Sequence, residues 1–153
     1  MEKHILIKKR DRLLELWEGE SLYARYPVAL GFAPEGHKER EGDGRTPEGE
    51  YYVCTRNDQS KFYLALGLSY PEKKDAAQAL EEGRIDRDTY DTIAAAIDSG
   101  KRPPWDTSLG GAIMIHGMGI RGDWTHGCIA VENEVMDILW VRCPLGTSVT
   151  ILP

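Results

Sequence analysis

The sequence predicts a mainly β protein with peripheral helices, arranged as a twisted sheet or an open, barrel-like sandwich. Short apolar runs with alternating polar residues recur from residue 4 to residue 31, separated by the glycines and charged residues that are typical of hairpins. The chain also contains 16 glycines in 153 residues, which favours an architecture rich in turns. Helical periodicity is confined to residues 75–99 and 133–142, and we expect these helices on the outside of the sheet.

The N-terminal 31 residues predict three strands. Residues 4–8 alternate between apolar and polar types, residues 13–17 follow a charged turn, and residues 21–30 form the third run. Pro27 removes a backbone donor from this third run, so we expect that strand to be bulged or to lie at an edge of the sheet. The basic residues 8–12 fall at a turn, where we expect them to face solvent.

A polar loop then leads to Thr46-Pro47-Glu48-Gly49. Pro47 fixes its φ near −65° and Gly49 permits positive φ, so this turn can direct the strand expected over residues 51–55. A further strand is predicted over residues 62–70, immediately before Pro71.

Two helical segments interrupt the β pattern. Asp75 and Gln78 have the spacing of a capping box, and Gly83 stands where that helix would end. The second segment runs from about residue 86 to residue 99 and repeats apolar residues at helical spacing. A third helix is predicted after Asn133, its expected N-cap. Strands over residues 112–116, 128–131 and 148–152 complete the sheet.

Length and composition bound the class of protein. At 153 residues, we expect residues 1–153 to form a single domain. We also expect a monomer. The net charge of −6 argues against a nucleic-acid partner, because phosphate binding needs a dense basic surface. No apolar run approaches the ~18 residues of a membrane span, and the N-terminus lacks the apolar core of a secretory signal. By these signals alone, the chain is expected in the cytoplasm.

The three cysteines differ in their surroundings. Cys54, Cys128 and Cys143 cannot all pair with one another, and none belongs to a Cys-x-x-Cys motif, so a disulfide scaffold is excluded. Cys54 lies in a strand pattern and Cys143 ends a helical pattern, which indicates small, buried, apolar roles. Only Cys128 has histidines and glycines around it.

The segment of residues 113–131 contains the candidate chemistry. It places His116, His126 and Cys128 between two apolar, strand-like runs. A thiol with an ordinary pKa is only a few per cent ionised at neutral pH, so a nucleophilic cysteine needs a base or cation beside it. The glycines of the segment allow backbone N–H groups to face a reacting carbonyl. The pattern therefore predicts a cysteine nucleophile with a histidine base.

Two motifs resemble a known family. The residues Ile-His116-Gly117, followed by Trp-Thr-His-Gly-Cys128-Ile, are similar to the signature of the L,D-transpeptidase catalytic domain (YkuD-like). The Thr-Pro-Glu-Gly-Glu-Tyr run of residues 46–51 resembles the upstream motif of the same family. With the opening strands and the closing run, the resemblance covers nearly the whole chain and implies an L,D-transpeptidase-like β fold. The short spacing between His116 and Cys128, and Ala130 where many members have arginine, indicate a divergent branch.

The resemblance implies acyl transfer on peptidoglycan stem peptides, in the periplasm or cell envelope, without a cofactor or metal. His116 takes the thiol proton, Cys128 attacks an acyl carbonyl to form a thioester, and a second nucleophile resolves it. The carbonyl of Gly117 would hold the other imidazole nitrogen. The backbone N–H groups of Gly127 and Cys128 are the expected oxyanion donors.

Five further residues are candidates for substrate binding. His126 is interpreted as a shaping or hydrogen-bonding residue. Arg121 and Trp124, in the loop between His116 and Cys128, are candidates to contact a substrate carboxylate and its aliphatic stem, and surface roles are the alternative. Tyr70 is expected at the border of the site or, alternatively, in the core. Trp105 is expected beside the catalytic loop.

Several alternatives stay open from sequence alone. A hydrolase of the same family, cutting a peptide or amide link at diaminopimelate, shares the chemistry up to the thioester. A zinc site at His116, His126 and Cys128 would need further ligands, and the spacing of the last two is awkward for one tetrahedral ion. A redox thiol would need Cys54 or Cys143 next to Cys128. A non-catalytic module would bind wall peptides without consuming them.

Overall fold

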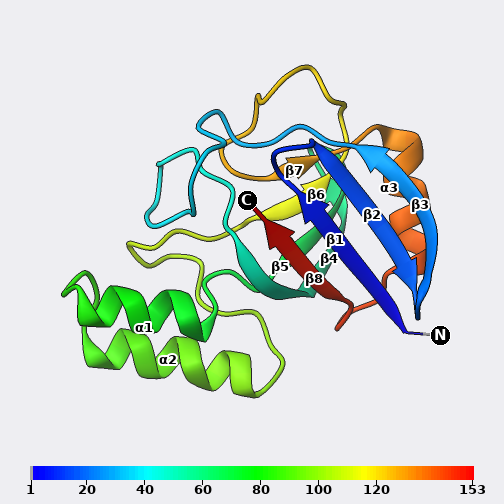
Figure 1. Cartoon of the computed structure of the whole chain (residues 1–153). Helices are drawn as coiled ribbons and strands as arrows, with labels where there is room; N and C mark the ends of the chain where they lie inside the picture. The colour runs from blue at the N-terminus through cyan, green and yellow to red at the C-terminus, as the bar shows by residue number, and fades with distance from the viewer. Residues whose placement is uncertain (1) are drawn as a thin grey trace.

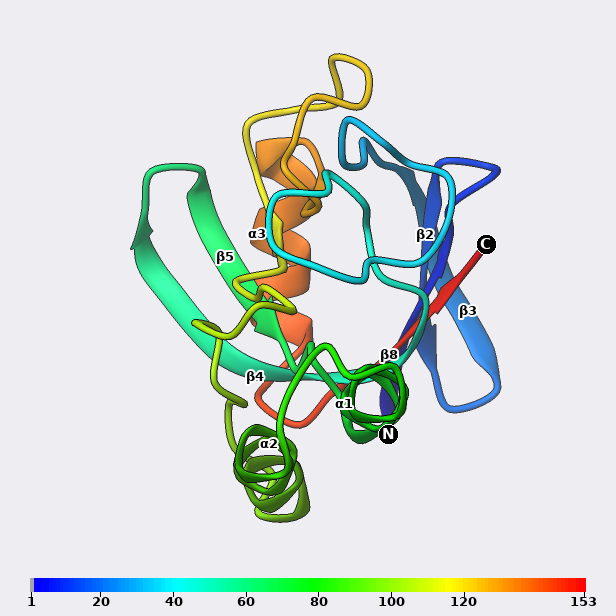
Figure 2. The same cartoon turned by 90° about the vertical axis from the view of Figure 1, so that its left-hand side faces the viewer.

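The computed structural model describes residues 2–153, which form an eight-stranded sheet with three helices. The strand order is β3-β2-β1-β8-β4-β5-β6-β7, and the sheet curls into a half-barrel (Figures 1 and 2). The mainly β class is therefore confirmed. The strands are β1 (Lys3–Lys8), β2 (Leu13–Glu18), β3 (Ser21–Pro27), β4 (Gly49–Ser60), β5 (Tyr63–Leu68), β6 (Met114–His116), β7 (Ile129–Ala130) and β8 (Ser148–Leu152). The helices are α1 (Lys73–Glu81), α2 (Arg87–Asp98) and α3 (Asn133–Arg142).

The pairing of β6 with β7 determines how the candidate site is built. These two strands are parallel, with Ile115 opposite Ile129 and His116 opposite Ala130. Parallel neighbours cannot be joined by a tight hairpin, so the chain between them has to cross from one end of the pair to the other. The connection of residues 117–128 does this, and it contains the predicted nucleophile.

The chain after β3 closes the curled sheet against β7. Ala29 and Ala130 exchange two backbone hydrogen bonds of 2.9 Å, and the Phe32 N–H donates to the Thr125 carbonyl over 2.9 Å. Strand β7 is consequently paired on both sides, although it is the last strand in the sheet order. As predicted, β3, which ends at Pro27, lies at an edge of the sheet.

Helix α3 packs inside the curl of the sheet, not on its outside as predicted (Figure 2). Its Val135, Met136 and Leu139 are buried in the main core, which explains the position, because the concave face of a half-barrel needs an apolar cover. The core joins this helix to inward-facing strand residues, including Ile5, Ile7, Leu14, Leu16, Val53, Leu66, Leu68, Ile115, Ile129, Val149 and Ile151.

Helices α1 and α2 form a hairpin outside the sheet, as predicted (Figures 1 and 2). They pack on each other and on Leu109. Helix α1 starts earlier than expected: Glu72 is its N-cap, and Asp75 completes the capping box by accepting from the Glu72 N–H over 2.9 Å. The predicted box of Asp75 with Gln78 is wrong. The prediction placed aspartate at the N-cap because aspartate is preferred there in general, whereas in the structure Glu72 is the N-cap and Asp75 is the N3 residue. Among residues 2–153, no helix is long and apolar enough to cross a membrane.

Gly31 lies where three backbone segments meet. A Cβ at this position would be 2.1 Å from the Gly44 carbonyl oxygen and 2.9 Å from the Gly127 Cα. Neither neighbour is a flexible side chain, so an added methyl group must displace backbone.

We expect Gly31→Ala to lower the free energy of unfolding by roughly 3 kcal/mol, as for other overpacked interior sites. Denaturant unfolding monitored by circular dichroism measures this loss. Gly42→Ala is the matched control. Its added Cβ has no atom within 4 Å and costs only about 1–2 kcal/mol for the left-handed φ of +81°. Equal losses in the two variants would contradict the proposed crowding at Gly31.

Candidate active site

Cys128 is half-buried and lies one residue before β7. Its Sγ is 3.4 Å from the Ala112 carbonyl oxygen, to which the thiol can donate. The Met114 N–H points at the same sulfur, with a nitrogen-to-sulfur distance of 3.4 Å. Burial raises the pKa of Cys128, while the Met114 N–H and the positive charge of Lys38 act in the opposite direction. The net direction is upward, so the resting group at neutral pH is a thiol.

His116 ends β6 and is buried. Its Nδ1 lies 2.8 Å from the Gly117 carbonyl oxygen, the contact that the family resemblance implied. A carbonyl can only accept, so Nδ1 must carry the hydrogen, and Nε2 of the neutral ring keeps its lone pair. Burial lowers the pKa of His116, and the bond to Gly117 offsets part of this effect. The ring is thus a neutral base with a fixed tautomer.

The strand register puts His116 and Cys128 on one face of the sheet. Because Ile115 pairs with Ile129, Cys128 lies opposite Met114, and His116 is two residues further along β6. Side chains two residues apart in a strand share a face, so the imidazole and the thiol are diagonal neighbours. Within residues 2–153, the hydrogen bonds of Sγ go to Ala112 and Met114 and not to the imidazole.

Aromatic rings cover His116. Phe62 stacks on the imidazole with centroids 4.4 Å apart and an interplanar angle of 20°, and Trp124 meets it edge-on at 5.5 Å. Trp124 is held by its Nε1–H bond of 2.9 Å to the Gly119 carbonyl, and the Arg121 guanidinium lies 5.1 Å from its ring centroid. Trp124 thus lies directly against the predicted base, while Arg121 stays exposed above the loop.

Thr125 holds the turn that presents the cysteine. Its Oγ1 donates to the Cys128 carbonyl over 2.7 Å and accepts from the Gly127 N–H over 3.1 Å. The two predicted oxyanion donors therefore differ. The Gly127 N–H is already bonded, whereas the Cys128 N–H finds no acceptor in the part of the chain that the structure describes. The Met114 N–H is a further donor near the sulfur.

The other predicted substrate-binding residues have different locations. His126 is exposed, and its ring meets Phe32 at right angles with centroids 5.6 Å apart. Trp105 packs against Gly67 and Gly111, beneath the segment that leads to Ala112, and its buried Nε1–H has no partner among residues 2–153.

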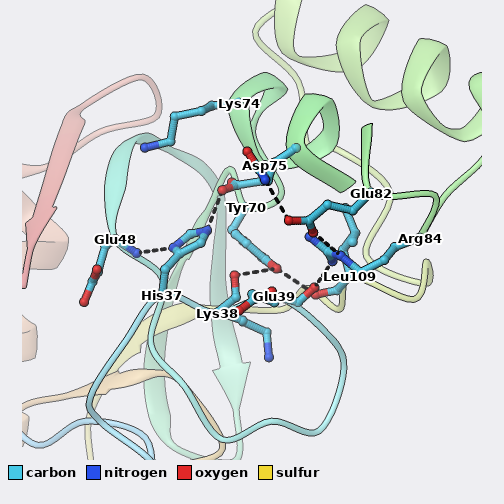
Figure 3. A pocket seen from close by; sticks show the side chains of 11 residues that line it. His37, Lys38, Glu39, Glu48, Tyr70, Lys74, Asp75, Glu82, Arg84 and Leu109 are labelled. Atoms are coloured by element: carbon cyan, nitrogen blue, oxygen red, sulfur yellow. Dashed lines mark hydrogen bonds and ion pairs between the residues drawn. The ribbon is translucent and has the colours of Figure 1, made fainter. Parts of the chain in front are cut away.

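Tyr70 is buried away from the cysteine. Its hydroxyl donates to the Leu109 carbonyl over 2.8 Å, and its ring lines a cavity of about 380 Å³ between α1 and residues 37–48 (Figure 3). In that cavity, His37 bonds Asp75 through Nε2 over 2.7 Å and accepts from the Glu48 N–H through Nδ1 over 2.8 Å. Neither His116 nor Cys128 lines the cavity.

Sequence analysis missed several residues that hold the site. Asn133 was predicted to cap α3, but Glu132 occupies that position without a side-chain bond. The Asn133 Oδ1 instead accepts from the Met118 N–H over 2.8 Å, in the loop that follows His116. The predicted cap is wrong because the amide stabilises a residue with φ of +80°. Phe62, Met114 and Thr125 were also missed; the Thr-x-x-Cys spacing is the one local signal that could have indicated Thr125.

The remaining sulfur and metal hypotheses can be compared with the geometry. All three cysteines are free thiols. Burial raises the pKa of Cys54 to about 12 and that of Cys143 to about 11. Over residues 2–153, no three His, Cys, Asp or Glu side chains gather in an arrangement that could hold a metal ion.

Residues 2–151 match the model of the L,D-transpeptidase catalytic domain (YkuD). The chain therefore belongs to this family, as the motifs around His116 and Cys128 predicted. Among curated proteins, it is similar to YafK of Escherichia coli strain K12, with 32% identity over 85 residues, 51% of this chain and 34% of YafK.

Two solved structures share the fold. The helical cell shape determining protein Pgp2 from Campylobacter jejuni is 20% identical, with a TM-score of 0.67, over 97% of this chain and 46% of that one. Bd1075 from Bdellovibrio bacteriovorus is 23% identical, with a TM-score of 0.63, over 98% and 47% respectively. The chain thus spans about a third of the length of YafK and less than half of these two chains.

We expect Thr125→Val to slow the alkylation of Cys128 or to change its pH profile, because the turn before the nucleophile loses both hydroxyl bonds. It should also lower the free energy of unfolding by about 1–3 kcal/mol, since the buried Gly127 N–H loses its acceptor, the Thr125 hydroxyl oxygen. Mass spectrometry of the alkylated Cys128 peptide and denaturant unfolding measure the two effects. Thr125→Ser keeps the hydroxyl and serves as the control. A valine variant that behaves like the serine variant would contradict this role.

Proposed function

We propose that the chain is a cysteine acyltransferase that acts on peptidoglycan stem peptides through a thioester, with Cys128 as the nucleophile and His116 as the base. The observation that carries the proposal is the fixed tautomer of His116. Its Nδ1–H is bonded to Gly117, which leaves the Nε2 lone pair available on the face of the sheet that also presents Cys128. A neutral thiol and a neutral imidazole are the starting state of such a reaction.

The charges explain when the proton moves. Ordinary pKa values of about 8.5 for cysteine and about 6.5 for histidine make the ion pair unfavourable by roughly 2.7 kcal/mol. Burial widens this gap, because it raises the pKa of Cys128 and lowers that of His116. The proton is therefore transferred as the sulfur attacks the substrate carbonyl, and not beforehand.

The later steps use the same two residues. The free Cys128 N–H, with the Met114 N–H as a further candidate, stabilises the negative oxygen of the tetrahedral intermediate. His116 then gives its proton to the leaving amine, and the C–N bond breaks to leave the thioester. An acceptor amine attacks this thioester and passes its proton to His116, the C–S bond breaks, and His116 returns the proton to the Cys128 thiolate.

We propose transfer to an amine over hydrolysis because the chain belongs to the L,D-transpeptidase catalytic domain family, and the aromatic cover on the base is compatible with it. Phe62 and Trp124 enclose the imidazole on two sides, which limits the access of water to the proton acceptor. The partial exposure of the Cys128 residue is the observation that supports the alternative, an L,D-carboxypeptidase or amidase of the same family. We further propose that residues 1–153 form one catalytic domain that works as a monomer at the cell envelope.

Replacing the nucleophile should abolish turnover. We expect Cys128→Ala to lower the rate of D-residue release from a tetrapeptide donor by at least about 10³-fold, because the covalent route is lost. Chromatography of the released amino acid measures the rate. Cys54→Ala is the matched control and should keep the activity of the parent protein. Retained turnover in the Cys128 variant would overturn the assignment.

The choice between transfer and hydrolysis is measured with a tetrapeptide donor and an isotopically labelled diamino-acid acceptor. The proposal predicts that the label enters the peptide product. Release of the terminal D-residue without incorporation of the label would show that water resolves the thioester, and would replace the transferase by the hydrolase.

A further inference from the structure

The peptide unit between Gly117 and Met118 connects the candidate base to helix α3. Its carbonyl oxygen accepts from Nδ1 of His116 over 2.8 Å, and its N–H donates to Oδ1 of Asn133 over 2.8 Å. This peptide bond is trans, so its carbonyl and its N–H point in opposite directions. His116 and Asn133 therefore hold the same peptide group from its two sides.

The backbone at Met118 explains why this peptide needs a second partner. Met118 has a φ of +80°, in the left-handed region that residues other than glycine rarely adopt. Rotating the peptide by half a turn would return φ to a negative value, and it would carry the carbonyl oxygen away from His116. The bond to Asn133 opposes this rotation, because the Met118 N–H would lose its acceptor.

Helix α3 places Asn133 for this contact. Glu132 is the N-cap, and Asn133 is the first residue of the helix, half-buried beside the loop. Of all neighbouring atoms, Oδ1 of Asn133 would lie nearest to a Cβ added at Gly117. A side chain at this position would displace the amide from its bond to Met118, which is a physical reason for a glycine directly after the histidine.

The surroundings of the imidazole leave the peptide as its fixed polar partner. Among residues 2–153, no carboxylate forms a hydrogen bond with the ring of His116, whose Nδ1 bonds the Gly117 carbonyl. The side chains around the ring are two aromatic groups, the cations above them and the candidate nucleophile: Phe62, Trp124, Lys61, Arg121 and Cys128. The peptide thus takes the part that a carboxylate plays beside the histidine of a Ser-His-Asp triad.

We propose that Asn133 is a positioning residue of the active site, which fixes the tautomer of His116 through the peptide between Gly117 and Met118. The inference rests on the proposed function, in which Nε2 of the neutral imidazole takes the thiol proton. Hydrogen bonds in a chain polarise one another, so the bond to Asn133 also makes the Gly117 carbonyl a stronger acceptor. That carbonyl raises the pKa of His116 and offsets part of the effect of burial.

The test is NMR spectroscopy of the imidazole nitrogens in protein that carries isotopically labelled histidine, because these signals report both tautomer and pKa. Loss of signals in His116→Gln identifies those of His116. In Asn133→Ala, we expect a mixture of tautomers and a lower pKa of His116, because the Gly117 carbonyl is no longer held in place. In Asn133→Asp, the acceptor is kept and a negative charge is added, so the tautomer should stay and the pKa should rise.

Turnover of a tetrapeptide donor should follow the tautomer. We expect Asn133→Ala to lower kcat by roughly 10- to 100-fold, as when other partners that orient a functional histidine are removed. KM should stay unchanged, since Asn133 acts only through the peptide. Asn133→Asp should recover most of the lost rate. Glu132→Gln is the matched control, because the Glu132 side chain makes no capping bond, and it should behave as the parent protein in every measurement.

A purely structural role of Asn133 makes a different forecast. His116 would then keep its Nδ1–H tautomer and its pKa in both Asn133 variants, and this result overturns the proposal. Shifts of the pKa in the same direction in the alanine and aspartate variants overturn it as well. If Asn133→Ala does not fold by circular dichroism, Asn133→Asp decides: a raised pKa with the Nδ1–H tautomer supports the proposal, and an unchanged or lowered pKa overturns it.

The NMR measurement needs no substrate, so the two proposals fail separately. The expected shifts in a protein that does not turn over tetrapeptide would support the role of Asn133 and contradict the proposed function. Normal turnover in Asn133→Ala with an unchanged tautomer of His116 would do the reverse.

Discussion

The close packing of three backbone segments around Gly127 is the constraint on which the rest of the site depends. Gly31, Gly127 and the carbonyls of Gly44 and Arg45 approach one another at distances that leave no room for a Cβ. This contact joins the end of the first three strands, the loop before β4 and the turn that presents Cys128. Closure of the sheet against β7 depends on this contact. The close approach of the backbones at Gly31 and Gly127 lets residues 28–32 form backbone hydrogen bonds with residues 125–130. The sheet thereby fixes the position of the nucleophile from both sides.

The same closure creates the electrostatic character of the site. Burial makes the charged forms of Cys128 and His116 unfavourable, so the resting pair is neutral. In the mechanism that we propose, the proton moves only with the attack on substrate. The stacking of Phe62 and the edge of Trp124 keep the imidazole dry, and the Gly117 carbonyl fixes its tautomer. In the proposed mechanism, the negative sulfur is stabilised by a fixed dipole, the Met114 N–H, whose nitrogen lies 3.4 Å from Sγ.

Local sequence pattern predicted the parts of the fold that depend on local preferences. Alternation and glycine-rich turns located the strands, and helical spacing located α1, α2 and α3 to within a few residues. The concave position of α3 was not predictable in this way, because periodicity identifies an apolar face without identifying what covers it. The Asn133 amide was assigned to a helix cap for the same reason: a cap is a local contact, whereas its bond to Met118 depends on the path of a loop 15 residues away.

In the candidate site, too, local motifs identified some residues, whereas others could be identified only from the fold. The His-Gly and Thr-His-Gly-Cys motifs indicated the candidate base and nucleophile. Part of what holds these two residues is close to them in sequence: Gly117 accepts from His116, and Thr125 donates to the Cys128 carbonyl. Phe62 and Met114 are distant in sequence from Cys128, and the folded sheet brings Phe62 to the imidazole and the Met114 N–H to the sulfur. The central claim, that Cys128 carries the acyl group, is tested most directly by acid-quenching the protein with a tetrapeptide donor and mapping its peptides by mass spectrometry. The account predicts a thioester on the Cys128 peptide, with the mass of the donor acyl group lacking its terminal D-residue. Product formation with an adduct on Cys54 or Cys143, or with no adduct in any quench time, would contradict it.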